Sequence, residues 1–323
     1  MKGRPQLMAV FAVLLTVLPL ISLLKGRAPE KPGQPSGDGK VLILLDPGAP
    51  TELSMRDYII GAVAAQMPGD FSPEALKAQA VLAHTYALRR RIEEQKDPTP
   101  ELCGADLSSD TSLYQAYFTP EQIRSLYGSE TESILKKLGA AADYALTRSL
   151  TFEGKPIIAA FHAVSPGRTE SARDVWGENI PYLVSVESPG DEKEPSCSSE
   201  VSFTENELAG KLRASFPELP DKYEHSPAEI VSRTEAGSVS EAEIFGEMRV
   251  SGVELAAALG LESAHFELSE SDGEYVFKVL GRGHLVGMSQ LGAERMAKGG
   301  KLCEEILGHY FPGAGLENSE TVV

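Results

Sequence analysis

The strongest constraint on the fold is the stretch from Glu52 to Arg91, whose sequence predicts two helices joined by a tight turn. Apolar residues recur every three or four positions between Met55 and Val63, which is the spacing of one buried helix face. Pro68 disfavours helical geometry at the preceding residue, so the first helix is expected to run from Ser54 to Gln66. Gln66 therefore ends an apolar stripe, which places a polar side chain at the buried end of the hairpin.

The second helix is expected to begin at Pro73, after the N-cap Ser72, and to end at the basic residues around Arg91. Lys77 and His84 are seven positions apart on this helix, so they share one face and lie about 10 Å apart along its axis. From the pattern alone, the favoured interpretation is an ordinary helical hairpin in which both side chains are solvated.

Three blocks of sequence occur in order along the chain and carry a family resemblance. They are Ala65-Gln66-Met67-Pro68 with Glu74–Ala80 and Ala83-His84-Thr85-Tyr86; Gly167-Arg168-Thr169-Glu170-Ser171 with Val175-Trp176-Gly177; and Gly283–Gln290. Together they resemble the signature of the stage II sporulation protein D family and the related amidase-enhancer domain. The resemblance covers about residues 40–314, and three motifs in the right order make it specific.

The resemblance implies a lytic transglycosylase of sporulation, active in engulfment on peptidoglycan strands that have lost their stem peptides. Such an enzyme cleaves between N-acetylmuramic acid and N-acetylglucosamine and leaves 1,6-anhydro products. One carboxylic acid protonates the leaving oxygen, and its carboxylate form then assists the attack of the muramoyl 6-hydroxyl. The acid needs a partly apolar pocket that raises its pKa, and the end of a buried helical stripe is such a place.

The acid position of the family corresponds to Gln66 in this chain. An amide does not deliver a proton at neutral pH, and loss of a general acid typically costs about 10²- to 10⁴-fold in rate. Three interpretations stay open. The chain is a non-catalytic glycan-binding module that recruits or stimulates a cell-wall amidase; Asp70 or Glu74 takes the acid role; or Gln66 is an engineered replacement that traps substrate.

The resemblance also supplies candidate glycan-binding residues, expected to line a groove between the hairpin and the later blocks: Lys77, His84, Arg168 and Gln290. His84 stands where the family usually has an arginine. Leu285 replaces the middle glycine of a Gly-His-Gly-Val-Gly-like segment, where a positive φ is expected. Trp176 either stacks on a sugar ring or belongs to the core, and the core is the commoner place for a lone tryptophan.

Neither a metal nor a cofactor is predicted. The chain has three cysteines, and no Cys-x-x-Cys occurs among them. Metal-bearing members of the family carry Cys and His ligands just before a Gln-Ala-Tyr segment. Here Ser108, Leu113 and Tyr114 occupy the corresponding positions, so no metal site is transferred.

The formal net charge of −17 argues against nucleic acid as a partner, because phosphate binding needs clustered Lys and Arg. It is compatible with a glycan, which binds through local polar groups. By resemblance, the expected partners are peptidoglycan glycan strands, a membrane-bound cell-wall amidase and an anchoring membrane protein of the engulfment machinery.

Residues 7–24 are almost wholly apolar and would span about 27 Å as a helix, enough to cross a bilayer core. Lys2 and Arg4 precede this run and favour a cytoplasmic N-terminus. We therefore expect a single-pass protein of the cell membrane with its domain on the extracytoplasmic side, facing the space between mother cell and forespore during sporulation. A cleaved signal peptide is the competing interpretation, although Gly26-Arg27-Ala28 makes a poor cleavage site.

The mixture of helices and short strands, without a regular βαβ rhythm, predicts an α+β fold. We expect an anchor over residues 1–25, a Pro- and Gly-rich tether over 26–40, one large domain over 41–314 and a flexible tail over 315–323. Within the domain we expect a helical region at 120–148, a hairpin at 150–164 and an acidic, loop-rich insertion with short strands at 187–249. Strands are expected at 266 and 275–280, and helices beginning at Ser251 and Met288.

Overall fold

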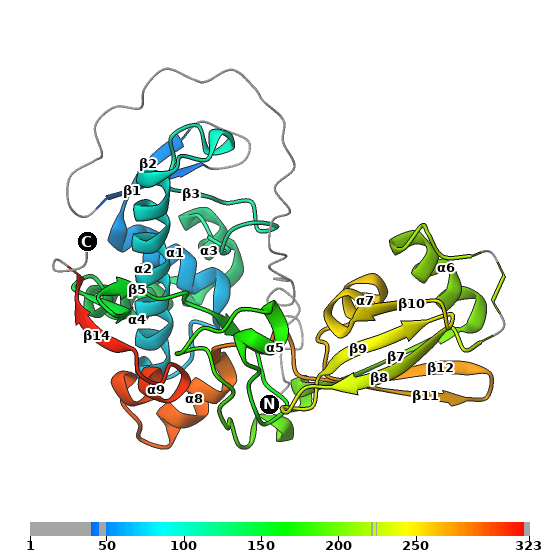
Figure 1. Cartoon of the computed structure of the whole chain (residues 1–323). Helices are drawn as coiled ribbons and strands as arrows, with labels where there is room; N and C mark the ends of the chain where they lie inside the picture. The colour runs from blue at the N-terminus through cyan, green and yellow to red at the C-terminus, as the bar shows by residue number, and fades with distance from the viewer. Residues whose placement is uncertain (1–39, 45–49, 221, 224, 320–323) are drawn as a thin grey trace. The chain divides into compact units, whose positions relative to one another are not determined.

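The computed structural model describes residues 40–44, 50–220, 222–223 and 225–319. They form the predicted α+β fold, coloured by residue number in Figure 1. In place of the single domain expected over 41–314, these residues divide into two compact units. Unit 1 takes the described parts of Met1–Ala160, Ala293–His309 and Gly313–Val323, and unit 2 takes Phe161–Gly292 with Tyr310–Pro312.

The predicted helical hairpin forms the centre of unit 1. Helix α1 (Met55–Gln66) begins after Ser54, whose hydroxyl accepts a hydrogen bond from the Asp57 backbone N–H. Met67 is extended, with φ −140° and ψ 141°, as the following Pro68 requires. Helix α2 (Pro73–Lys96) then runs on past Arg91. Its many alanines allow α1, α4 (Thr131–Ala145) and strand β4 (Arg148–Phe152) to pack closely against it (Figure 1).

The helical region expected over 120–148 is two helices, α3 (Pro120–Tyr127) and α4 (Thr131–Ala145). Gly128 separates them with φ 52° and ψ −121°, a conformation that a right-handed helix does not accommodate. The apolar side of α4, with Ile134 and Leu138 buried, packs on the hairpin as its periodicity predicts.

Two small sheets complete unit 1. In the first, β1 (Lys40–Leu44) pairs antiparallel with β2 (Pro50–Ser54) and parallel with β3 (Leu107–Ser108). In the second, β4 (Arg148–Phe152) lies between β5 (Lys155–Pro156) and β14 (Gly315–Asn318).

Strand β14 corrects the prediction of a flexible tail over 315–323. The expected hairpin turn at Glu153-Gly154 exists, but β5 pairs with only the last two residues of β4. The other edge of β4 offers unpaired backbone groups, and β14 pairs with them so that Leu316 lies opposite Leu150. Residues 320–323 lie outside the described part of the chain.

Unit 2 begins at Phe161, a few residues after the hairpin formed by β4 and β5. Strand β6 (Phe161–His162) pairs in parallel with β13 (Met288–Ser289), and the short helix α5 (Ala172–Trp176) follows. Because Met288 and Ser289 are strand residues, helix α8 (Gln290–Lys298) starts at Gln290 and not at the predicted Met288. Its first residues belong to unit 2 and the rest to unit 1, after which α9 (Cys303–Tyr310) follows.

The predicted insertion at 187–249 contains the expected short strands, and together with residues up to 280 it forms a regular substructure of unit 2. Its helices α6 (Glu205–Ser215) and α7 (Gly252–Leu259) lie on one side of its strands (Figure 1). Phe203, Phe266 and Phe277 meet in the core between them. The helix predicted to begin at Ser251 is α7, which begins at Gly252 with Ser251 as its N-cap. The elements are β7 (Ser198–Thr204), α6 (Glu205–Ser215), β8 (Ala228–Arg233), β9 (Val239–Ile244), β10 (Met248–Ser251), α7 (Gly252–Leu259), β11 (Phe266–Ser271) and β12 (Glu274–Leu280), with sheet orders β10-β9-β8 and β11-β12-β7.

The predicted anchor at residues 7–24 and the tether at 26–40 lie almost wholly outside the described residues, so both stay predictions. Among the residues that the structure describes, no helix has the length and apolar character needed to cross a membrane.

Candidate functional site

Gln66, at the last position of α1, is 4% exposed and is held at both ends of its amide. Its Nε2 donates to the Ala116 carbonyl at 3.1 Å and to Gln115 Oε1 at 3.4 Å. Its Oε1 accepts a hydrogen bond from Gln79 Nε2 at 2.7 Å. Donors therefore meet the oxygen and acceptors meet the nitrogen, which fixes the direction of the side chain.

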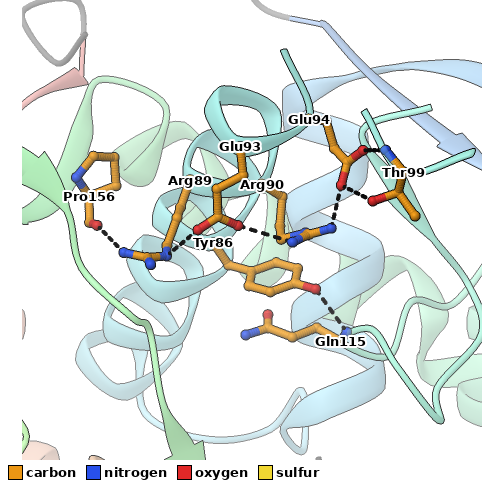
Figure 2. Close-up of polar contacts among 8 residues, drawn as sticks. All are labelled: Tyr86, Arg89, Arg90, Glu93, Glu94, Thr99, Gln115 and Pro156. Carbon is orange, nitrogen blue, oxygen red and sulfur yellow. Dashed lines mark hydrogen bonds and ion pairs between the residues drawn. The ribbon is translucent and has the colours of Figure 1, made fainter. Parts of the chain in front are cut away.

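The segment that carries Gln115 is attached to the far half of α2. The Gln115 backbone N–H donates to the Tyr86 hydroxyl at 3.4 Å, and Figure 2 shows the Tyr86 ring reaching from the helix toward it. Burial raises the pKa of Tyr86 to about 12, so the phenol stays neutral at physiological pH. Tyr86 belongs to the first sequence block, and here it positions a neighbour of Gln66.

A cluster of charged residues surrounds this attachment (Figure 2). Arg90 pairs with Glu94 at 2.6 Å, and its guanidinium lies 5.4 Å from the centre of the Tyr114 ring. Glu94 in turn accepts hydrogen bonds from the backbone N–H and the hydroxyl of Thr99. These contacts hold Thr99 and Tyr114, which lie near the two ends of the 100–115 segment, against α2.

Lys77 and His84 share a face of α2, as predicted, but that face is not the one that meets Gln66. Residues two apart on a helix are separated by about 200°, so Lys77 points away from Gln79. Lys77 Nζ lies 2.6 Å from Glu74 Oε1 and 5.1 Å from the centre of the Tyr144 ring of α4.

His84 is buried, in contrast to the solvated side chain that the pattern favoured. Its Nδ1 lies 2.8 Å from the Arg148 carbonyl, so this nitrogen carries the proton and donates it. Burial lowers the pKa of His84, which keeps the ring neutral. A neutral buried histidine that bonds to strand β4 is part of the packing between α2 and the sheet.

The two alternative acids lie in unsuitable surroundings. Asp70 is exposed in the turn after α1. Glu74 Oε2 accepts a hydrogen bond from the Cys303 backbone N–H, at the start of α9. Burial raises the pKa of Glu74, but hydrogen bonds from Lys77 and Cys303 outweigh it and leave the pKa below its usual value. Glu74 is therefore ionised at neutral pH and does not store a proton for a leaving group.

The start of α2 is held by Glu294 of α8. Glu294 Oε2 accepts from the Ser72 backbone N–H at 2.6 Å, and Oε1 accepts from the Ser72 hydroxyl at 3.1 Å. Ser72 is the N-cap residue, as predicted, but its hydroxyl does not cap the helix. A carboxylate from another helix instead satisfies this end, where the helix dipole favours negative charge.

The second and third sequence blocks lie together in unit 2. The Glu170 backbone N–H donates to the Leu285 carbonyl at 2.8 Å, and the Trp176 ring lies 5.4 Å from the His284 ring. Arg168 Nε donates to the Ser185 hydroxyl at 2.9 Å. Gln290 is buried at the start of α8.

The four predicted glycan-binding residues thus divide between the two units. Lys77 and His84 lie in unit 1 with Gln66, and Arg168 and Gln290 lie in unit 2. The groove expected between the hairpin and the later blocks stays a prediction, and so do the roles of these residues.

Leu285 takes the positive φ that the glycine of the family pattern predicts, at 64°. A left-handed conformation costs a non-glycine residue roughly 1–2 kcal/mol. Leu285 is buried, and burial of a leucine side chain contributes about as much in the opposite direction. The substitution therefore leaves the backbone of the third block in the expected conformation.

Three polar residues at the centre of these contacts were not singled out from the sequence. Gln79 and Gln115 bond to Gln66, and the buried Asp191 accepts hydrogen bonds from the hydroxyls of Ser165, Ser188 and Ser289. Gln79 lies within the first block, where a polar residue among alanines was a usable signal. Asp191 lies in an acidic run and carries no such signal.

Within the described ranges, no three His, Cys, Asp or Glu side chains gather where they would hold a metal ion. Of the positions that correspond by resemblance to metal ligands in the family, Ser108 is buried in β3, whereas Leu113 is exposed.

Comparison with known proteins relates the chain to sporulation proteins. A family profile described as "Stage II sporulation protein" matches residues 48–152. Stage II sporulation protein D of Bacillus amyloliquefaciens is 35% identical over 269 residues, covering 83% of this chain and 76% of that protein. The protein of the same name from Bacillus subtilis is 35% identical over 270 residues, with the same coverage. The "Amidase enhancer" of Bacillus subtilis is 24% identical over 309 residues, or 79% of this chain and 40% of that protein.

Proposed function

Because this chain belongs to the stage II sporulation protein D family, we propose that it remodels peptidoglycan during sporulation by binding denuded glycan strands, with slow or no cleavage of its own. The proposal of slow or absent cleavage rests on the side chain of Gln66. It stands at the family's acid position as a buried, hydrogen-bonded amide.

The chemistry of lytic cleavage supports the distinction between binding and cleavage. The glycosidic oxygen must receive a proton as the bond to the muramoyl carbon breaks, and an amide has none to give at neutral pH. Glu74 is ionised and bonded to α9, and Asp70 is exposed. A glycan strand held at this site would therefore remain largely intact.

A second candidate function is to recruit or stimulate a cell-wall amidase. The relative named "Amidase enhancer" favours it, since that name describes an effect on another enzyme. A protein that holds denuded strands without cutting them would serve as a platform for such an enzyme. This role needs no ionisable group at position 66.

The direct test is to incubate the full-length protein, in detergent, with denuded glycan strands. Strand binding is measured by co-sedimentation and products by mass spectrometry. We expect binding with few or no 1,6-anhydro products. Rapid release of anhydro products by the native protein would contradict the slow-cleavage proposal, and absence of binding would contradict the glycan substrate.

We also propose that the protein is a single-pass membrane protein with its domain outside the cytoplasm, on the basis of the apolar run at residues 7–24 after Lys2 and Arg4. Protease added to intact protoplasts should then remove the domain. Full protection of the domain while the membrane stays sealed would contradict this topology.

A further inference from the structure

We propose that Gln79 and Gln115 are positioning residues that select a neutral, hydrogen-bond-donating side chain at position 66 and fix its direction. This inference rests on the proposed function, in which position 66 faces the glycan. It adds to that function the residues that determine what kind of group the position accepts.

The first step is the polarity of the contacts. The contacts of position 66 include a donor, the Gln79 amide nitrogen, on the side of its oxygen and acceptors, the Ala116 carbonyl and Gln115 Oε1, on the side of its nitrogen. A group that fits must accept on one side and donate on the other. A glutamine does this, and a protonated carboxylic acid does it with nearly the same shape, whereas a carboxylate has no proton to donate.

The second step is that these partners are themselves held. Gln79 is fully buried on α2 between alanines. Gln115 Nε2 donates to the Ala159 carbonyl at 3.5 Å, so the amide oxygen of Gln115 is the end that remains for Gln66. The Tyr86 hydroxyl holds the Gln115 backbone in addition (Figure 2). The acceptor side of the site therefore does not turn to present a donor instead.

The third step follows for an acid at this position. An ionised carboxyl would place a negative oxygen near the Ala116 carbonyl in a site that is 4% exposed. Burial and a neighbouring acceptor both disfavour the charged form and raise the pKa of a carboxyl group. The surroundings of Gln66 are thus arranged to keep an acid protonated, and in this chain they hold an amide in the same geometry.

The test uses the full-length Gln66→Glu protein and follows the introduced carboxyl by carbon-13 NMR, with wild-type spectra subtracted. We expect it to titrate above the ordinary glutamate pKa of about 4.3. Adding Gln79→Met removes the donor that stabilises the charged form, so the pKa should rise further. Adding Gln115→Ala removes an acceptor and admits water, so the pKa should fall.

The matched control is Gln95→Ala, which alters an exposed glutamine of the same helix and should leave the titration unchanged. A merely structural role for Gln79 and Gln115 would change stability without moving the pKa in opposite directions. Titration of the introduced carboxyl at or below about 4.3 would overturn the proposal, and so would shifts of the same sign in both double variants.

If Gln66→Glu is unfolded at neutral pH, it is refolded at pH 4 and titrated upward. Folding at low pH that is lost as the pH rises supports the proposal, because only the protonated form fits. Failure to fold at every pH overturns it. The readout is independent of glycan cleavage, so a raised pKa without any cleavage leaves the positioning roles standing and agrees with the non-catalytic binding role. Absence of glycan binding by the native protein would contradict the proposed function and would also leave the positioning roles standing.

Discussion

Two buried polar side chains, one in each unit, are held in opposite ways. Gln66 of unit 1 has a donor on one side and acceptors on the other. Asp191 of unit 2 has one carboxyl oxygen that accepts from the hydroxyls of Ser165, Ser188 and Ser289. The comparison shows that the polarity of the surrounding groups, more than burial itself, determines which side chain a site tolerates.

The two sites also differ in what they connect. Asp191 joins Ser165, just before the second sequence block, to Ser289 within the third block. Gln66 joins the end of α1 to α2 and to the 115–116 segment. We therefore expect changes at Asp191 to affect mainly the stability of unit 2, and changes at Gln66 to affect mainly chemistry.

The largest expected effect is that of Asp191→Ala, which leaves several buried hydroxyls without their acceptor. Each unsatisfied buried group costs about 1–3 kcal/mol, so we expect a loss of about 4 kcal/mol in the free energy of unfolding of unit 2. Urea unfolding followed by fluorescence of Trp176, the one tryptophan of the chain, reports on this unit. Glu178→Ala, at an exposed position of unit 2, is the control. Equal stability of the two variants would contradict a central role for Asp191.

The next effect is on chemistry. Gln66→Glu supplies a proton donor in nearly the same shape, so cleavage of denuded strands should appear or rise by at least about 10²-fold. Release of anhydro products is measured by mass spectrometry, with the near-isosteric Gln66→Met as a control that adds no acid. If native protein already cleaves quickly and Gln66→Glu changes nothing, the acid lies elsewhere, and Asp70→Asn and Glu74→Gln become the next variants.

A smaller effect is expected at Glu74, which connects α2 to α9. The pKa of Glu74 is lowered in the folded state, so its stabilising contribution is complete above about pH 4.3 and is lost as the pH falls through the folded-state value. Glu74→Gln should cost about 1 kcal/mol at pH 7 and little near pH 3. Chemical denaturation at both pH values measures this. A cost that does not change with pH would contradict an ionic role.

The smallest expected effect on stability is at Lys77 and Arg168. Both are partly exposed and make ion pairs of the kind that contributes about 0–1 kcal/mol. Lys77→Ala and Arg168→Ala should therefore leave the melting temperature nearly unchanged while weakening co-sedimentation with glycan strands. Lys136→Ala, at an exposed position on α4, is the control. A loss of stability that matches the loss of binding would favour a purely structural role.

Local rules predicted much of the hairpin. Ser54, Pro68 and Pro73 set the helix boundaries through capping and restricted backbone angles, and these effects act within a few residues. The positive φ at Leu285 followed in the same way from the glycine pattern. Local patterns failed at Gly315–Asn318, because that strand depends on the open edge of β4 far away in the sequence.

The sequence by itself determined that position 66 is a polar residue at the end of a buried stripe. Only the tertiary structure decided which groups meet it. Gln115 is 49 positions away, and Ser289 is 98 positions from Asp191. Helical periodicity indicates which face of the helix a side chain occupies, but it does not indicate which segment packs on that face. The partners of Gln66, and the separate side of α2 taken by Lys77 and His84, follow from how distant segments close around the hairpin.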